Sequence, residues 1–242
     1  MYTKKCLSVL LALAVMLTVA ACNAGVVRGS GDLVTETRQV SDFDSIDLSG
    51  VGEVIVTQGG SESLTVETDD NVMKHVKTVV ENGTLKLGFE EGINFIDPSR
   101  LVFNVGVDDL TGLTISGSGD VEADTIETDR LDVTVSGSGD IQIADLSTGE
   151  LDTNISGSGE VSLAGEAAAQ DVKISGSGKY LAGDLCGESV KVNVSGSGDA
   201  TVCATETLDS NISGSGSVNY YGQPSINASG SGSGTLNSLG EK

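Results

Sequence analysis

A short Ser-Gly motif recurs at nearly equal intervals along the second half of the chain. Each copy is a Val, Ile or Ala followed by Ser-Gly-Ser-Gly. The first serines of the copies lie at positions 116, 136, 156, 175, 195, 213 and 229, so successive copies are 20, 20, 19, 20, 18 and 16 residues apart. A repeat of about 20 residues with small drift is typical of a solenoid, in which each repeat forms one coil and stacks on the next.

The segments between these motifs alternate between apolar and polar residues. Leu131–Val135 and Val190–Val194 carry apolar side chains at every second position, and Val121–Ala123 begins a second, shorter alternation after the motif. A period of two indicates strands with one buried face. Glycine corners permit backbone angles that a Cβ would forbid. Short strands joined by glycine corners, with a coil of about 20 residues, predict an all-β parallel β-helix.

In a stack of coils, equivalent residues lie above one another. The column directly after the Ser-Gly motif begins with three successive acids, Asp120, Asp140 and Glu160. It continues with Lys179, Asp199 and Ser217. Stacked carboxylates are candidates for a calcium site, because Ca²⁺ binds oxygen ligands. Lys179 and Ser217 break the acidic column and argue against such a site. We therefore expect no metal site and no cofactor, with these three acids as the only calcium candidates.

The first 21 residues have the pattern of a secretory signal. Lys4 and Lys5 precede an apolar segment, Cys6–Ala21, which is too short for a typical membrane span. The segment ends in Val-Ala-Ala-Cys22, which is similar to a bacterial lipobox. This pattern predicts export, lipidation at Cys22 and a membrane contact through the lipid. The alternative is an ordinary signal peptide with Cys22 incidental.

Two cysteines remain in the exported part of the chain. Cys186 and Cys203 lie in neighbouring coils, and disulfides persist in exported proteins. They are therefore a possible disulfide, provided that their coils bring the Cα atoms within about 7 Å. Two free thiols are the alternative. The only histidine is His75, so a zinc site or a Cys-His nucleophile is not expected.

The repeat divides the chain into regions. We expect a signal over residues 1–21, a tether over 22–40, a less regular β region over 41–113 that caps the stack, the Ser-Gly-repeat β-helix over 114–235, and a tail over 236–242. In the capping region Asn82-Gly83 predicts a hairpin turn. Asn71–Val80 is ambiguous between a short helix and a strand.

Charge and composition exclude several functions. A formal net charge of −22 opposes contact with nucleic acid. The chain has no Trp, its tyrosines lie mostly late in the sequence, and Arg130 and Lys179 are isolated basic residues among acids. An enzyme acting on carbohydrate needs acids beside a basic residue, usually with aromatic platforms, so this alternative is disfavoured and no catalytic residue is predicted.

The order of motifs resembles a known family. The segments Phe43–Val54, Asn82–Leu87 and Leu110–Val121, followed by the later Ser-Gly copies, are similar to the auto-transporter adhesin head domain called the GIN domain. The resemblance covers about residues 40–225. It implies a right-handed parallel β-helix in a bacterial exported protein, and it supplies no catalytic residue.

These observations favour a non-catalytic, lipid-anchored protein of the bacterial cell envelope, at the outer membrane or cell surface. It would act as an adhesin-like or scaffold module with an unknown protein or glycan partner. A carbohydrate-active enzyme and an envelope sensing or stress accessory are the alternatives. Self-association into a homo-oligomer is a further expectation that the sequence leaves open.

Overall fold

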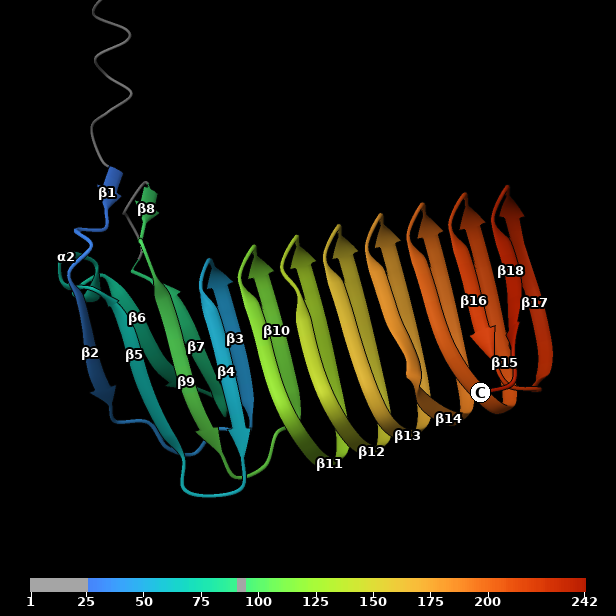
Figure 1. The fold of residues 1–242 in the computed structure, drawn as a ribbon, viewed down its shortest axis with the longest axis horizontal. Helices are drawn as coiled ribbons and strands as arrows, with labels where there is room; N and C mark the ends of the chain where they lie inside the picture. The colour runs from blue at the N-terminus through green and yellow to red at the C-terminus, as the bar shows by residue number, and fades with distance from the viewer. Residues whose placement is uncertain (1–25, 91–94) are drawn as a thin grey trace, which may run out of the picture.

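The computed structural model describes residues 26–90 and 95–242, which form a stack of β coils (Figure 1). Within these residues the one helix is the short α2 (Asp70–Met73), and no helix is long and apolar enough to cross a bilayer. The expected signal and the lipidation residue Cys22 lie outside the described residues. All other regular structure is strand.

The body of the stack begins with the short strand β10 (Gly112–Gly117) and continues with long strands that each follow the chain through most of one coil. The long strands are β11 (Asp120–Gly137), β12 (Ile141–Gly157), β13 (Glu160–Gly176), β14 (Lys179–Gly196) and β15 (Asp199–Gly214). Each pairs in parallel with the next, and their Ser-Gly motifs are in register from Ser116 to Ser213. The predicted parallel β-helix is confirmed.

The corners of the coils bring backbone against backbone. Ser138 N donates to the carbonyl oxygen of Gly117 over 2.8 Å, and the same bond recurs at every later corner up to Ser233. Gly137 has φ 140°, and a Cβ placed on it would lie 2.1 Å from the Gly117 carbonyl oxygen. A Cβ on Gly139 would lie equally close to the Gly119 carbonyl oxygen. Both glycines are therefore required by the coil below them.

The interior of the stack is filled by the apolar half of each alternating strand. Leu131, Val133 and Val135 have no exposed surface, and the equivalent residues of the following coils up to β15 are also buried. Tyr180 is the largest of the fully buried side chains, and its hydroxyl donates to Gln170 Oε1 over 3.0 Å. Burial raises the pKa of Tyr180, so this phenol stays protonated.

The last coil has a different register from the one that the sequence suggests. The coil after β15 consists of β16 (Ser217–Tyr221) and β17 (Ser225–Gly232), and β18 (Thr235–Gly240) stacks on β16 and begins a further coil. Ser213 pairs with Ser231, not with Ser229, so the final step is 18 residues and not 16. The continuous Ser-Gly run over residues 229–234 fits either register. Because β18 reaches Gly240, the stack also occupies most of the segment expected to be a tail over 236–242.

The region over residues 41–113 supplies both a first coil and a closing cap. The first coil is β3 (Ser45–Gly50) and β4 (Glu53–Gln58), which pair in parallel with β10 and β11. Next to them, β7 (Thr84–Phe89) and β9 (Leu101–Val107) extend the same two faces in parallel. Antiparallel strands then close the faces: β6 (Val76–Glu81) on β7, and β5 (Ser63–Asp69) followed by β2 (Leu33–Arg38) on β9.

The structure tests three predictions for segments of the cap, namely residues 22–40, 71–80 and 82–83. The tether expected over 22–40 is wrong for part of its length, because β1 (Val26–Arg28) pairs with β8 (Phe95–Asp97) and β2 pairs with β5. The ambiguous segment 71–80 contains the end of α2 and most of β6, so each interpretation holds for one part. The Asn82-Gly83 turn is confirmed, with positive φ at both residues.

A buried carboxylate holds the cap together. Asp69, at the end of β5, is fully buried and accepts hydrogen bonds from Ser99 Oγ at 2.6 Å, Gly31 N at 2.7 Å and Ser99 N at 2.8 Å. These donors join the turn before β2 and the segment before β9 to one side chain. The Ser99 hydroxyl, helped by the two backbone N–H groups and opposed by burial, lowers the pKa of Asp69.

The corner contacts predict the effect of adding one methyl group. We expect Gly137→Ala to lower the free energy of unfolding by about 1–2 kcal/mol for the left-handed backbone and a further 1–3 kcal/mol or so for overpacking. Gly50→Ala is the matched control, because Gly50 occupies the same corner of the first coil with φ 105° and open space around it. Equal losses in the two variants, measured by denaturant unfolding, would contradict the corner contact.

The cap carboxylate predicts a pH dependence. Since the folded pKa of Asp69 lies below its ordinary value near 3.8, its stabilising contribution is present above that pH and is lost as the pH falls toward the folded pKa. Asp69→Asn should therefore destabilise the protein at neutral pH, and its deficit should shrink below about pH 4. The exposed neighbour Asp70→Asn is the control. A deficit that stays constant in thermal melts from neutral to acid pH would refute this role.

Candidate functional site

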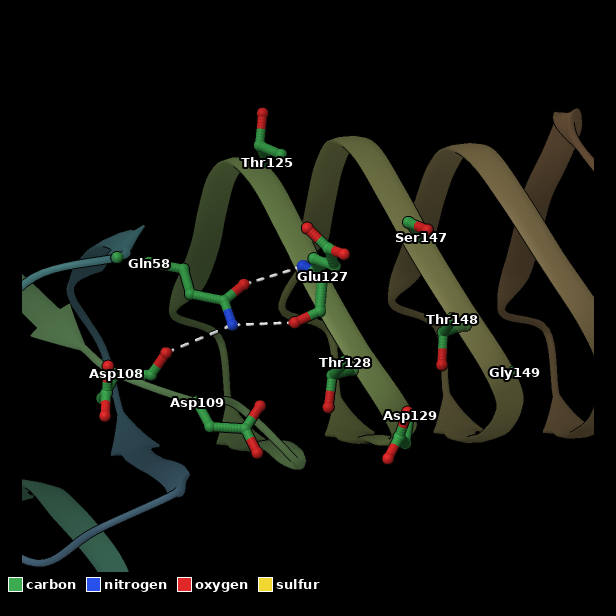
Figure 2. A pocket seen from close by; sticks show the side chains of 11 residues that line it. Gln58, Asp108, Asp109, Thr125, Glu127, Thr128, Asp129, Ser147, Thr148 and Gly149 are labelled. Atoms are coloured by element: carbon green, nitrogen blue, oxygen red, sulfur yellow. Dashed lines mark hydrogen bonds between the residues drawn. The ribbon is translucent and has the colours of Figure 1, made fainter.

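An open groove lies where the cap meets the repeat. It has a volume of about 810 Å³ and is formed by the end of β4, the segment between β9 and β10, and the middle of β11 and β12. The lining residues shown in Figure 2 are Gln58, Asp108, Asp109, Thr125, Glu127, Thr128, Asp129, Ser147, Thr148 and Gly149, and Gly59 completes them.

The groove exists because the first coil is incomplete. The pairing of β4 with β11 ends at Ala123, since the chain leaves the stack after Gln58. The next part of β11, Thr125–Thr128, pairs with Asp145–Thr148 on one side. Among the described residues no strand pairs with the other side of Thr125–Thr128. This part of β11 is therefore an unpaired strand edge that borders the groove.

The side chain of Gln58 partly replaces the missing strand. Its Oε1 accepts from Glu127 N over 2.7 Å, and its Nε2 donates to the Glu127 carbonyl oxygen over 2.8 Å. The same Nε2 also donates to the Asp108 carbonyl oxygen over 3.3 Å. Figure 2 shows this amide spanning from the cap to the coil. One side chain thus makes the pair of bonds that a neighbouring strand would make with Glu127.

The chemistry of the lining is that of hydrogen-bond acceptors and hydroxyls. Carboxylates come from Asp108, Asp109, Glu127 and Asp129, all exposed, and hydroxyls come from threonine and serine residues of two successive coils. No lining residue is basic or aromatic. Such a surface favours neutral or basic ligands that donate hydrogen bonds, and it repels acidic ones. Its size lies within the range of about 300–1,000 Å³ that is usual for ligand pockets.

The acids considered for calcium have a different role in the structure. Asp140 N donates to Asp120 Oδ1 over 3.1 Å, and Glu160 N donates to Asp140 Oδ1 over 2.8 Å. Asp199 accepts from Ser217 N in the same way over 2.9 Å. The carboxylates of Asp120, Asp140 and Asp199 therefore bind the backbone of the following coil, whereas that of Glu160 lies 3.8 Å from the Lys179 ammonium. Within the described residues no group of three or more His, Cys, Asp or Glu side chains is arranged to hold a metal ion.

The structure joins Cys186 and Cys203 in a disulfide, which is the first of the two alternatives that the sequence left open. Their Cα atoms are 4.5 Å apart, and the two residues are direct partners of β14 and β15. The register shifts between Ala182 and Cys186 of β14, where β15 has three residues fewer, and this shift places Cys186 beside Cys203. A loop closed over 17 positions contributes about 3 kcal/mol by restricting the unfolded chain.

The basic residues Arg130 and Lys179, isolated in the sequence, both have acidic partners in the structure. Arg130 forms ion pairs with Asp132 at 3.2 Å, Glu150 at 2.8 Å and Asp152 at 2.5 Å, and its hydrogen bond to Asp132 is the main reason that its pKa is raised. Lys179 lies 3.8 Å from Glu160 in the coil below. Both residues are exposed and connect neighbouring coils, and neither lines the groove.

Sequence reasoning missed the groove. Gln58 lies 69 residues before Glu127, and nothing in its surroundings marks it as a bridge to another coil. The one available signal was the pair Asp108-Asp109 directly after the strand Leu101–Val107. These two acids lie in the connection between β9 and β10. This connection borders the place where the first coil is incomplete, and the edge of β11 is exposed there.

Comparison with known proteins identifies similar chains. The family described as "Putative auto-transporter adhesin, head GIN domain" matches residues 42–224. A putative adhesin from Bacteroides fragilis is 30% identical, with a TM-score of 0.84 over 88% of this chain and 100% of that one. No curated protein matches the chain.

Two further solved structures are similar. A putative lipid binding protein from Parabacteroides distasonis is 27% identical, with a TM-score of 0.76 over 88% of this chain and 99% of that one. A putative adhesin from Parabacteroides merdae is 25% identical, with a TM-score of 0.73 over 89% of this chain and 100% of that one.

Proposed function

The chain belongs to the auto-transporter adhesin family with a head GIN domain, and from this premise we propose that it is an exported, lipid-anchored and non-catalytic binding module of the bacterial cell envelope. Cys22 carries the lipid in this proposal. The groove beside Gln58 is the contact surface for a protein or glycan partner.

The observation that carries the proposal is the composition of the groove. Four carboxylates and several hydroxyls meet in an open hollow of about 810 Å³ without a basic or aromatic neighbour in its lining. Acid-base catalysis on sugars usually sets a proton donor against a second charged group in a closed site, whereas this hollow is open and its acids are exposed. The arrangement supports recognition more than chemistry.

The polarity of the groove lining indicates which class of partner to expect. One structural relative is described as a putative lipid binding protein. An acyl chain needs an apolar cavity, and the lining here is mainly carboxylate and hydroxyl. We therefore infer a neutral or basic polar partner for this chain.

The anchor is tested by changing Cys22. In intact bacteria the wild-type protein should sediment with the membrane fraction and incorporate an alkynyl fatty acid. Cys22→Ser should appear in the soluble exported fraction without label, because its membrane affinity depends on the buried acyl chains. Cys186→Ser is the control and should keep the label. Labelled, membrane-bound Cys22→Ser protein would refute the anchor.

The groove is tested by reversing one charge. The probe is an array of neutral glycans, sulfated glycans, basic proteins and acidic proteins, with the exported protein as analyte. We expect binding to neutral or basic members, and Asp129→Lys should weaken it about tenfold or more. Glu122→Lys makes the same charge change in the same strand outside the groove and should leave binding unchanged. Binding that survives Asp129→Lys, or is lost equally in both variants, would contradict the proposal.

A further inference from the structure

The last coil leaves two strand edges without partners. β17 pairs with β15, and β18 pairs with β16, each on its inner side. Across residues 26–90 and 95–242 no strand pairs with their outer sides, which form the far end of the stack in Figure 1. Every residue of β17 is exposed. An unpaired parallel edge offers a row of N–H and C=O groups to another strand.

The interior of the β-helix is also open at this end. A hollow of about 430 Å³ is lined by Ile212, Ala228 and Leu236 together with glycines and serines of the last two coils. Ser210 lines the same hollow and is only 3% exposed, and its hydroxyl has no hydrogen-bond partner among the described residues. On the same two outer strands, Ile226 of β17 is 43% exposed and Leu239 of β18 is 47% exposed. Apolar and unsatisfied polar groups thus lie together where a further coil would cover them.

The charge pattern separates this end from the rest of the molecule. Residues 210–240 contain no Asp, Glu, Lys, Arg or His, and this is the longest uncharged stretch in a chain of net charge −22. Charged side chains normally protect exposed strand edges from pairing with other chains. Two copies of so acidic a protein repel one another over most of their surfaces. At the last coil this repulsion is weakest and the usual edge protection is missing.

The opposite end differs in charge. Antiparallel β2 and β6 end the two faces there, and their outer edges also have no partner among the described residues. These strands carry Glu36 and Arg38 on β2 and Lys77 and Glu81 on β6, which protect the edges from pairing with another chain. Lys242 donates to Asp184 and lies over the face of Tyr221, both on the side of the stack. A repeating head-to-tail filament would have to join the charged edges of β2 and β6 to the uncharged edges of β17 and β18. A twofold contact uses the open end twice and closes the assembly.

We propose that two copies of this chain join end to end through the outer edges of β17 and β18. The twofold axis makes the meeting strands antiparallel, and the contact covers the hollow beside Ser210 and the side chains of Ile226 and Leu239. The dimer presents one groove on each copy, far from the contact. This proposal goes beyond the binding function and does not depend on what the groove binds.

Sedimentation of the exported full chain as Cys22→Ser, which removes the lipid, tests the proposal. Over a concentration series we expect a monomer–dimer equilibrium. Ile226→Lys, which places a like charge on both sides of the contact, should weaken dimerisation about tenfold or more. Leu181→Lys is the matched control, because Leu181 is 37% exposed in the middle of the stack on β14. Thermal melts in dilute solution show whether each variant is folded.

Cross-linking gives a second measurement that does not require Ile226→Lys to fold. Asn227→Cys, on the outer strand β17, should be joined into dimers by a short bismaleimide, whereas Thr35→Cys on β2 at the charged opposite end should not. A protein that stays monomeric at every concentration, a dimer that is equally sensitive to Leu181→Lys, or cross-linking through Thr35→Cys alone would each overturn the proposal.

Discussion

The close approach of one backbone to the next at the Ser-Gly corners is the contact on which the structure depends. At Gly137 and Gly139 the carbonyl oxygens of the coil below lie where a Cβ would be, at 2.1 Å. The bond from Ser138 N to the Gly117 carbonyl oxygen forms because no side chain separates the coils. Since each corner sets the height of the next coil, it also sets the register of every strand that follows, and with it the columns of Val, Ile and Leu that fill the interior.

Both proposed contact surfaces lie where this stacking is interrupted. At the cap, the chain leaves the first coil after Gln58 and exposes the edge at Glu127, where a side-chain amide makes two of the bonds of a strand. At the other end, β17 and β18 have no partner on their outer sides among the described residues. In between, exposed acids such as Asp120 and Asp140 are engaged with the backbone of the coil above. In the two proposals, the regular part is a spacer and the interruptions at its ends are the contact surfaces.

The repeat alone was enough to predict the β-helix, because glycine at the corners and alternation between them leave few other folds. It did not determine the register of the last coil, since Ser229 and Ser231 belong to one uninterrupted Ser-Gly run. Nor did it show the groove, whose key contact joins Gln58 to Glu127 across 69 residues. The order of the cap strands was equally hidden, because β7 and β9 flank the first coil although they follow it in the chain. Local patterns predict coils, whereas the interruptions depend on contacts distant in sequence.

Distances between spin labels on one column of the stack test the central claim directly. Glu122, Thr201, Asn219 and Asn237 belong to a single column of paired positions. One spin label is placed at Glu122 and the other at Thr201, Asn219 or Asn237, and the labelled protein is diluted with unlabelled chain. Double electron–electron resonance should give separations of about 19, 24 and 29 Å, because each coil adds about 4.8 Å. Equal increments would support coils stacked in register through their glycine corners. Separations that do not grow with coil number would contradict the account.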